Sequence, residues 1–397
     1  MKKILIFSHA LELGGAERSL IGLLDAIDKS EYSVDLFLMR HTGELMKYIP
    51  EGVRLLPEVA AYTVPARPMV TTLREGHVRL TLGRLRGKVA AKKFNKKHPC
   101  TESAVEFDYS HKYIRRMMPE IEPGTEYDLA ISFLTPHYFV REKVRAKKYM
   151  AWIHTDYTKV GIDRVSELAM WGKYDKIVSV SDGVAEGFAE VFPSLSDKLM
   201  TIENILPEKI VRADAAADIH GEMDAGGIKL LSIGRFCNAK NFDNVPFICR
   251  RLVGSGLDVK WYIIGFGSDE ALIREKIAEA GMEDRVIILG KKENPYPYIA
   301  ACDLYVQPSR YEGKAVTVRE AQMLAKPVVI TRYASSQSQL NDGVDGIIVP
   351  MDNEGCADGI ADLLRDPGRM AMLSENCRMR DYSNASETEK IYNIMKG

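Results

Sequence analysis

Two glutamates, Glu312 and Glu320, lie eight positions apart where a predicted strand gives way to a predicted helix. The apolar run 303–307 predicts a buried strand, 308–311 a turn, and 315–325 a helix. At a rise of ~1.5 Å per residue, the two carboxylates would lie roughly 12 Å apart along the helix axis. Glycosidases hold their two catalytic carboxyl groups only about 5 to 9.5 Å apart. We therefore expect Glu312 and Glu320 to bind hydroxyl groups on different parts of one extended ligand.

Two basic residues, Arg235 and Lys240, follow the strand predicted at 229–233, and Asn241 is expected to open the next helix. Two fixed cations at a strand end can stabilise the negative charge that grows on a departing diphosphate. At about 4 Å and an effective dielectric constant near 20, each contributes roughly 4 kcal/mol of Coulomb energy before desolvation is subtracted. The alternative interpretation is a pair of surface cations with no ligand.

Other candidates also follow predicted strands. Gly14 and Gly15 separate the first strand from its helix, where glycine lets the backbone approach a ligand. His154 and Asp156 follow the strand predicted at 148–153, and Asp156 could orient His154. The alternatives are a plain tight turn for the glycines and a structural role for the histidine. The same position after a strand is shared by His9, His137 and Lys291.

Short apolar runs alternate with amphipathic helical segments, which is typical of parallel βαβ units. Ligands in such sheets bind outside the carboxyl ends of the strands, which is where the candidate residues lie. We expect a first domain at 1–206, a linker at 207–227, a second domain at 228–380 and a helix within 381–397 that can pack back on the first domain. The predicted strands are 4–8, 33–38, 129–133, 148–153, 176–179 and 199–202, then 229–233, 260–264, 286–289, 304–307, 328–331 and 346–349.

Composition excludes several classes of protein. A net charge of −1 over 397 residues excludes a globally basic nucleic-acid binder. The six cysteines are widely scattered, so we expect a reducing, cytoplasmic setting. The sequence has no Cys-x-x-Cys pair and no histidine cluster at metal-binding spacing, so we expect no metal site. The first residues predict a strand instead of a signal peptide. No run reaches the roughly 20 apolar residues that span a bilayer.

A basic insertion, at about 67–116, interrupts the first domain. Its centre has no acidic residue, and a basic amphipathic helix of this kind can lie on an anionic membrane surface, gaining about 1 kcal/mol per basic residue. The alternatives are a solvated helix packed by its apolar stripe onto the domain, and a nucleic-acid contact. The basic positions are Arg79, Arg84, Arg86, Lys88, Lys92, Lys93, Lys96 and Lys97, and the apolar ones are Val78, Leu80, Leu82, Leu85, Val89 and Phe94.

Three segments together, 312–320, 234–241 and 14–18, resemble the motifs of the family-four retaining glycosyltransferases, also called glycosyl transferases group 1. The likeness runs from the first strand to roughly residue 365. It implies the α/β GT-B fold, in which two Rossmann-like domains, each with a doubly wound parallel sheet, face a central cleft. Lys314 and Ala315 replace the aromatic residue and proline that are common after the first motif glutamate. The resemblance therefore does not specify which sugar the donor carries.

The resemblance also implies a role for each candidate. Arg235 and Lys240 would hold the nucleotide diphosphate, Glu320 the two ribose hydroxyls and Glu312 the donor sugar. His154 would contact that sugar near the reacting bond. Donor contacts would also come from Gly14, Gly15, Gly313, Lys314, Ala315, Val316 and the backbone at Lys291, and acceptor contacts from Asp156, His9 and His137.

The function implied by the resemblance is transfer of a hexose-type sugar from a nucleotide diphosphate, UDP by expectation, to a saccharide or lipid-linked acceptor, with no cofactor or metal. Surface polysaccharide or glycoconjugate synthesis is the expected setting. Three alternatives stay open: a nucleotide-sugar epimerase of the same fold, a non-catalytic scaffold, and an NAD-dependent oxidoreductase. The last is suggested by Gly265 and Gly267 after a strand, although a third glycine is missing and acidic residues follow.

Overall fold

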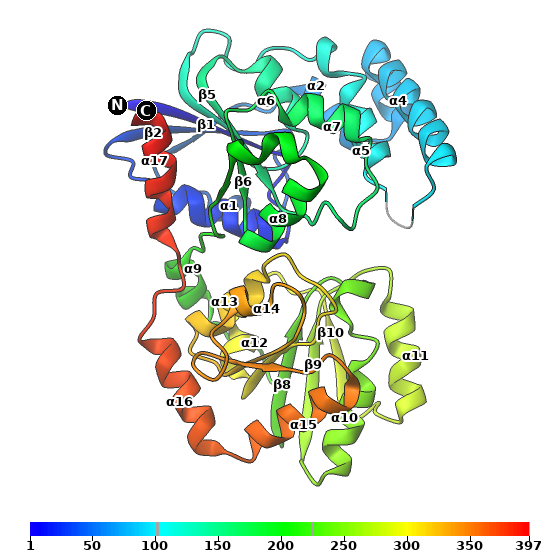
Figure 1. Ribbon diagram of the computed structural model, residues 1–397, viewed down its shortest axis with the longest axis vertical. Coiled ribbons are helices and arrows are strands. Elements are labelled where there is room, and N and C mark those ends of the chain that lie inside the picture. Colours follow the sequence, from blue (N-terminus) through cyan, green and yellow to red (C-terminus); the bar gives the residue numbers. More distant parts are fainter. Residues whose placement is uncertain (101–102, 224–225, 397) are drawn as a thin grey trace. The chain divides into compact units, whose positions relative to one another are not determined.

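The computed structural model describes residues 1–100, 103–223 and 226–396. The chain divides into two compact units, Met1–Ile205 with Ala385–Gly397, and Leu206–Asn384 (Figure 1). Each unit is built on one parallel sheet, so the predicted α/β class with two Rossmann-like domains is confirmed. Five positions from the predicted insertion, linker and C-terminal segment lie outside the described residues: Thr101, Glu102, Asp224, Ala225 and Gly397.

The first sheet has seven strands in the order β3-β2-β1-β4-β5-β6-β7. Its interior strand β1, between β2 and β4, is buried from Ile4 to Ser8, as expected for a parallel sheet covered on both faces. All six predicted strands of this half are confirmed, but the three-residue edge strand β3 was missed. The strands are β1 Lys2–Ser8, β2 Tyr32–Leu38, β3 Val53–Leu55, β4 Tyr127–Ser132, β5 Ala146–Ile153, β6 Lys176–Ser179 and β7 Leu199–Thr201.

The helices of the first unit include one from the chain's far end. In this helix, α17, the Tyr392 ring stacks on Tyr32 of β2 with centroids 4.3 Å apart, and its hydroxyl accepts a hydrogen bond from Asp28 N at 2.9 Å. The C-terminal segment therefore completes the first unit (Figure 1). The helices are α1 Gly15–Ala26, α2 Ala60–Thr63, α3 Met69–Arg74, α4 Val78–Lys97, α5 Val105–Lys112, α6 His137–Lys143, α7 Arg164–Trp171, α8 Asp182–Val191 and α17 Thr388–Lys396.

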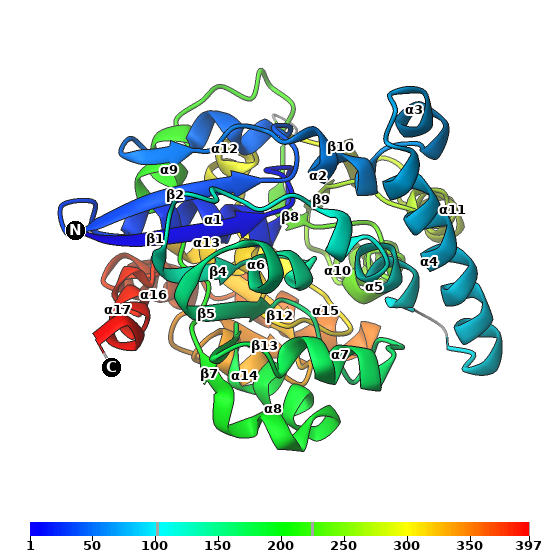
Figure 2. The same ribbon diagram turned by 90° about the horizontal axis from the view of Figure 1, so that it is seen from above.

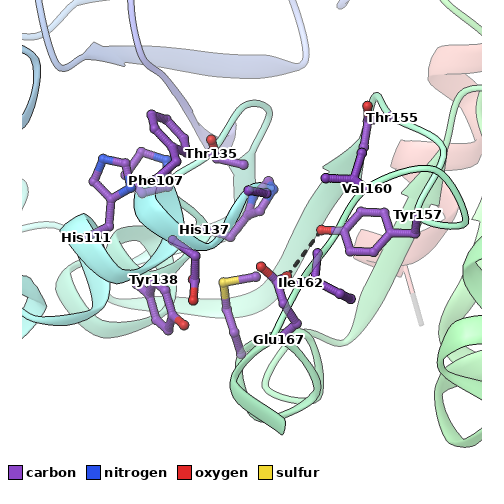
Figure 3. A pocket seen from close by; sticks show the side chains of 14 residues that line it. Phe107, His111, Thr135, His137, Tyr138, Thr155, Tyr157, Val160, Ile162 and Glu167 are labelled. Atoms are coloured by element: carbon purple, nitrogen blue, oxygen red, sulfur yellow. Dashed lines mark hydrogen bonds between the residues drawn. The ribbon is translucent and has the colours of Figure 1, made fainter. Parts of the chain in front are cut away.

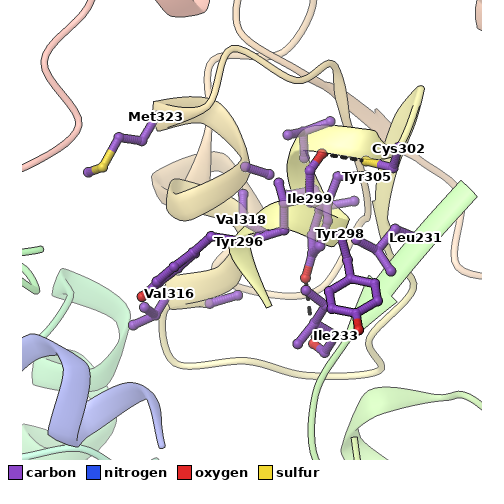
Figure 4. Close-up of a cluster of buried hydrophobic side chains, with 14 of the residues drawn as sticks. Leu231, Ile233, Tyr296, Tyr298, Ile299, Cys302, Tyr305, Val316, Val318 and Met323 are labelled. Carbon is purple, nitrogen blue, oxygen red and sulfur yellow. Dashed lines mark hydrogen bonds between the residues drawn. The ribbon is translucent and has the colours of Figure 1, made fainter. Parts of the chain in front are cut away.

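The second sheet has six strands in the order β10-β9-β8-β11-β12-β13. Alternate side chains of β8 enter different core clusters: Leu231 and Ile233 pack in one with Tyr305, and Leu230 packs in the other, because neighbouring strand residues point to opposite faces (Figure 4). All six predicted strands are confirmed. They are β8 Ile228–Ile233, β9 Val259–Ile264, β10 Val286–Gly290, β11 Leu304–Gln307, β12 Val328–Thr331 and β13 Ile347–Val349.

The helices of the second unit extend into the segment predicted as a linker. Residues 208–214 form α9, and both Val211 and Met223 are fully buried in a core cluster with Tyr298. Alanines and aspartates interrupt the apolar rhythm, which concealed these two core positions. The helices are α9 Glu208–Asp214, α10 Val245–Gly254, α11 Glu270–Ala280, α12 Tyr296–Ala301, α13 Val316–Met323, α14 Ser336–Gln339, α15 Asn353–Leu364 and α16 Pro367–Arg378.

Candidate functional site

The structure brings Lys240 and Glu312 together in the second unit. They meet because β8 and β11 are paired neighbours whose carboxyl ends share one edge of the sheet. Lys240 Nζ lies 2.5 Å from Glu312 Oε1, with the side chains only 19% and 11% exposed. Asn241 does not open a helix as predicted: it adopts a left-handed conformation, and its side chain donates to Pro308 O at 2.9 Å. That bond ties the loop carrying Lys240 to the loop carrying Glu312.

Glu312 is fixed by further contacts. Ser309 Oγ donates to Glu312 Oε1 at 2.6 Å, and Gln307 Nε2 donates to the same oxygen at 3.3 Å. Ser335 Oγ donates to the backbone oxygen of Glu312 at 2.8 Å. The hydrogen bonds that the described residues donate to the Glu312 carboxylate all reach Oε1.

Arg235, the second predicted cation, is exposed after β8. Its guanidinium has no hydrogen bond or ion pair within the described part of the chain. Gly234, just before it, lies close to the Lys240 side chain, since an added Cβ would lie 3.1 Å from Lys240 Cε. Of the two cations predicted after β8, Arg235 is therefore exposed and Lys240 is already held by a carboxylate.

Glu320 is fully buried within α13 and is not an exposed mid-helix glutamate. Its Oε1 accepts a hydrogen bond from the hydroxyl group of Tyr296 in α12 at 3.1 Å. Tyr296 belongs to the cluster of buried side chains drawn in Figure 4. A carboxylate in the interior requires polar partners, and a tyrosine hydroxyl supplies one.

The helix-start loop differs from the prediction. The Ala315 amide, expected to meet a donor, donates to Gln339 Oε1 at 2.7 Å, and Gln339 Nε2 donates back to Ala315 O at 3.2 Å. The N–H group of Ala315 is thus already hydrogen-bonded to the side chain of Gln339. Val316 is the first residue of α13 and is buried, while Gly313 and Lys314 are half-buried.

Lys291 and the glycine pair after β9 lie at the same carboxyl edge. Lys291 is exposed, with Nζ 5.3 Å from the Phe266 ring centroid. Gly265 and Gly267 pack against the loop after β8: added Cβ atoms would lie 1.9 Å from Gly234 O and 2.2 Å from Phe236 O. This close packing accounts for both glycines without a bound dinucleotide. The two glycines were the basis of the oxidoreductase alternative.

In the first unit, the histidines after β1, β4 and β5 follow neighbouring strands. His154 Nε2 is hydrogen-bonded to Phe133 O at 2.9 Å, and burial lowers the pKa of His154 to about 4. His137 Nδ1 lies 2.8 Å from Ser132 Oγ, and burial lowers its pKa to about 3. Burial, followed by the nearby Arg40 cation, also lowers the pKa of His9. His137 and His154 are therefore neutral at pH 7.

Asp156 does not orient His154. Its Oδ1 accepts hydrogen bonds from Thr158 N at 2.9 Å and Thr158 Oγ1 at 2.6 Å, so the carboxylate closes its own turn. Gly14 caps α1 with extended backbone, and an added Cβ would lie 2.1 Å from Glu17 Oε2. Gly15 begins the helix and is exposed. The glycine pair lies at the connection between β1 and α1, and Glu17 is the acidic residue in the first turn of that helix.

A cavity of about 120 Å³ lies beside this histidine group (Figure 3). Its walls come from the loops after β4 and β5 and from α5, α6 and α7. Most of the lining is apolar or aromatic, including Phe107, Tyr157 and Ile162, and His137 also lines it. The position at the carboxyl end of the sheet is the usual place for a ligand in an α/β unit.

Two carboxylates line this cavity, Asp108 and Glu167, and the sequence analysis selected neither. Glu167 is 5% exposed, and its Oε2 accepts a hydrogen bond from Tyr157 OH at 3.2 Å (Figure 3). The same oxygen accepts a second hydrogen bond from Trp171 Nε1 at 2.8 Å. Burial, followed by the neighbouring carboxylate of Asp108, raises the pKa of Glu167. No motif surrounds Glu167, and only its spacing after Asp163 at the start of a helix could have drawn attention to it.

Comparison with known proteins agrees with these motifs. Residues 220–380 match the family model described as glycosyl transferases group 1. This segment contains Arg235, Lys240, Glu312 and Glu320. Residues 220–380 belong to the glycosyl transferases group 1 family.

Relatives with assigned names extend the likeness beyond that segment. The chain is 27% identical over 214 residues to the lipopolysaccharide core biosynthesis glycosyltransferase LpsE of Rhizobium meliloti, covering 54% of this chain and 61% of LpsE. It is also 27% identical over 223 residues to an N-acetylgalactosaminyltransferase of Campylobacter jejuni that acts on a diphospho-undecaprenol substrate, covering 55% and 56% of the two chains. The match thus spans about three-fifths of the length of these group 1 relatives.

Solved structures share the fold across the whole chain. The Anabaena HepE structure in complex with UDP and glucose superposes with a TM-score of 0.67 at 15% identity, covering 100% of both chains. The GT-B class expected for group 1 enzymes is confirmed.

Within the described residues, no group of histidine, cysteine or acidic side chains is arranged to hold a metal ion. None of the described helices has the length and apolarity to cross a membrane.

Proposed function

We propose that the chain is a retaining glycosyltransferase that moves a sugar from a UDP-sugar to a saccharide or lipid-linked saccharide, in the synthesis of a surface polysaccharide or glycoconjugate. The observation that carries this proposal is the Lys240–Glu312 pair at adjoining strand ends, with exposed Arg235 beside the same strand. The group 1 match of this segment supports it, as does the UDP bound to a protein of the same fold.

On the donor side, Arg235 and Lys240 bind the diphosphate and stabilise the charge that grows as the glycosidic bond breaks. Only the part of this stabilisation that increases toward the transition state speeds the reaction. Glu312 accepts hydrogen bonds from the donor sugar through Oε2, and Glu320 accepts them from the ribose. The proposed donor contacts at Gly14, Gly15, Gly313, Lys314, Val316 and Lys291 complete this side.

The proposed mechanism is departure and attack on the same face of the sugar, through an oxocarbenium-like ion pair. The bond from the anomeric carbon to the phosphate oxygen breaks, and the acceptor oxygen forms the new bond. The leaving phosphate takes the acceptor proton, so the mechanism requires no protein nucleophile. Arg235 and Lys240 supply two positive charges to the diphosphate, which is why the proposal includes no metal. Neutral His154 donates or accepts a hydrogen bond at the sugar.

On the acceptor side, we assign the cavity beside His137 to part of the acceptor. His137 and the Glu167 carboxyl group supply hydrogen bonds there, and the aromatic walls pack against the apolar face of a sugar ring. His9 and Asp156 are the remaining proposed acceptor contacts of the first unit.

The test is a panel of UDP- and GDP-sugars incubated with and without saccharide and lipid-linked acceptors, following nucleotide release and transfer. Arg235→Ala, Lys240→Ala and Glu320→Ala should each lower transfer by about a hundred- to a thousandfold. Asp258→Asn, which removes the partner of Arg285 before the start of β9, is the matched control. Near-normal rates in all three variants would overturn the mechanism. Release of nucleotide or altered donor with no acceptor dependence would favour the epimerase alternative.

A further inference from the structure

The helix α4 carries apolar side chains on its outward face. Val78, Leu82, Leu85 and Val89 are 45%, 49%, 47% and 62% exposed. At ~100° per residue, these four positions fall within a wedge of roughly 60° around the helix. The short helix α3, beside the amino-terminal end of α4, adds two more exposed apolar side chains, Val70 and Leu73 (Figure 2).

The opposite face of α4 is the one packed on the protein. Gly83, Gly87 and Ala91 are buried there, and an added Cβ at Gly87 would lie 2.6 Å from Tyr109 O in α5. Arg84 is anchored on this side, since its Nη1 donates to the backbone oxygens of Val64 and Arg67, each at 2.7 Å. The interpretation that the apolar stripe holds α4 against the domain is therefore only partly right: Leu80 is buried and Phe94 packs against the cluster of Ala91, Val105 and Tyr109. The other four apolar side chains of the predicted stripe face outward.

Exposed basic side chains border the apolar stripe on both sides. At ~100° per residue, Arg86 and Lys93 lie on one side of it, and Lys88 and Lys92 on the other. The helix contains no acidic residue. One neighbouring carboxylate, Glu106 of α5, lies 3.3 Å from Lys88, and Glu75 pairs with Arg67 before α4 begins. Most of the positive charge on this face is therefore left for an external anion.

We propose that the outward face of α3 and α4 is a docking surface for an anionic lipid bilayer. An apolar stripe flanked by lysine and arginine matches an acyl boundary lined by acidic headgroups, where the apolar side chains enter and the long basic side chains reach the phosphates. A nucleic-acid backbone would use the charges but would leave the stripe exposed to water. Because the helix is anchored through its other face, docking requires no unfolding of the unit.

The experiment is co-sedimentation of the full chain with phosphatidylcholine vesicles containing 30 mol% phosphatidylglycerol, set beside pure phosphatidylcholine vesicles, at ~50 and ~300 mM NaCl. Wild type should bind the anionic vesicles at least tenfold more strongly, and less at high salt. The variant Leu82→Gln/Leu85→Gln/Val89→Gln removes the stripe and keeps every charge. The variant Lys92→Glu/Lys93→Glu reverses two flanking charges. Each should weaken binding at least tenfold.

Two matched controls use exposed residues outside α3 and α4. Leu272→Gln/Met372→Gln removes exposed apolar side chains that are 39% and 44% accessible, and Lys209→Glu/Lys396→Glu makes the same charge change as the lysine variant. Both should bind like wild type. Equal binding to both vesicle types, an unaffected stripe variant, or binding to a DNA duplex without binding to vesicles would overturn the proposal. A UDP-induced melting shift, measured on the same samples, tests the proposed function separately and also shows that each variant is folded.

Discussion

Lys240 Nζ lies 2.5 Å from Glu312 Oε1, across 72 residues of sequence, and both side chains are largely buried. A bound diphosphate must compete with this carboxylate for the ammonium group. The proposed catalytic lysine is therefore held in place by a group that also limits how strongly it attracts the donor.

The first prediction is that the two members of this pair affect UDP affinity in opposite directions. Glu312→Gln keeps the shape but removes the competing charge, so UDP should bind up to about tenfold more tightly. Lys240→Met should weaken binding by about ten- to a hundredfold, as for a lost charge-assisted hydrogen bond of roughly 1.5–3 kcal/mol. Calorimetric titration with UDP measures both. If both affinities move the same way, Lys240 does not bind the diphosphate.

A second prediction concerns the buried carboxylate of Glu320, which we assign to the ribose. A site built to accept hydrogen bonds from hydroxyl groups discriminates against a ligand that lacks one. Wild type should therefore bind UDP about tenfold or more tightly than 2′-deoxy-UDP, and Glu320→Gln should bind the two more equally. The exposed residue Glu354, changed to glutamine, is the control. Equal loss of affinity for both nucleotides in Glu320→Gln would assign this side chain to fold stability instead.

The sequence was sufficient to predict the longer strands and to place Lys240 and Glu312 after two of them. Long buried strands with apolar runs stand out in a parallel sheet, whereas β3, with three half-exposed or exposed residues, has too few buried positions to show a pattern. Adjacent strands β8 and β11 bring Lys240 and Glu312 to one edge, but only coordinates show that the two side chains form an ion pair.

Other features depend on packing that no local pattern records. The side of α4 that meets the protein combines Gly83 and Gly87 with Leu80, so counting apolar residues does not show which of them face the protein. Glu167 is important because distant segments bury it beside Asp108, and that proximity has no signature in the chain. Gln339 reaches Ala315 across 24 positions, which removes an amide that the helix start alone would offer to a ligand.

A third prediction follows from that glutamine. Gln339→Met removes both hydrogen bonds to Ala315 and leaves its buried N–H and C=O groups without these partners. An unsatisfied buried polar group costs about 1–3 kcal/mol, so the free energy of unfolding of the second unit should fall by at least that amount. Urea unfolding measures it. Gln337→Met is the control, because Gln337 lies in the same helix and is exposed. Equal stabilities of the two variants would contradict the assigned role of Gln339.

The last prediction concerns the pH dependence of the first unit. His137 is 2% exposed, and burial lowers its folded-state pKa to about 3, whereas an unfolded histidine has a pKa of about 6.5. Between these values the unfolded state binds more protons, so stability falls as the pH drops below about 6.5. At pH 5 the cost is about 2 kcal/mol, at about 1.36 kcal/mol per pH unit. His137→Asn lacks this titration, so its stability relative to wild type should rise by about 2 kcal/mol between pH 7.5 and pH 5.

The comparison between variant and wild type is needed because Glu167 titrates in the same unit with the opposite sign: burial raises its pKa, so its contribution falls as the pH rises. Taking the difference cancels that contribution. Urea unfolding can be followed by Trp152 and Trp171 fluorescence in a Trp261→Phe background, so that the signal comes from the first unit alone. The difference should stay constant from pH 7.5 to pH 8.5. If it also stays constant down to pH 5, His137 is able to take up a proton in the folded protein, and its assignment as a neutral hydrogen-bonding group at the cavity is wrong.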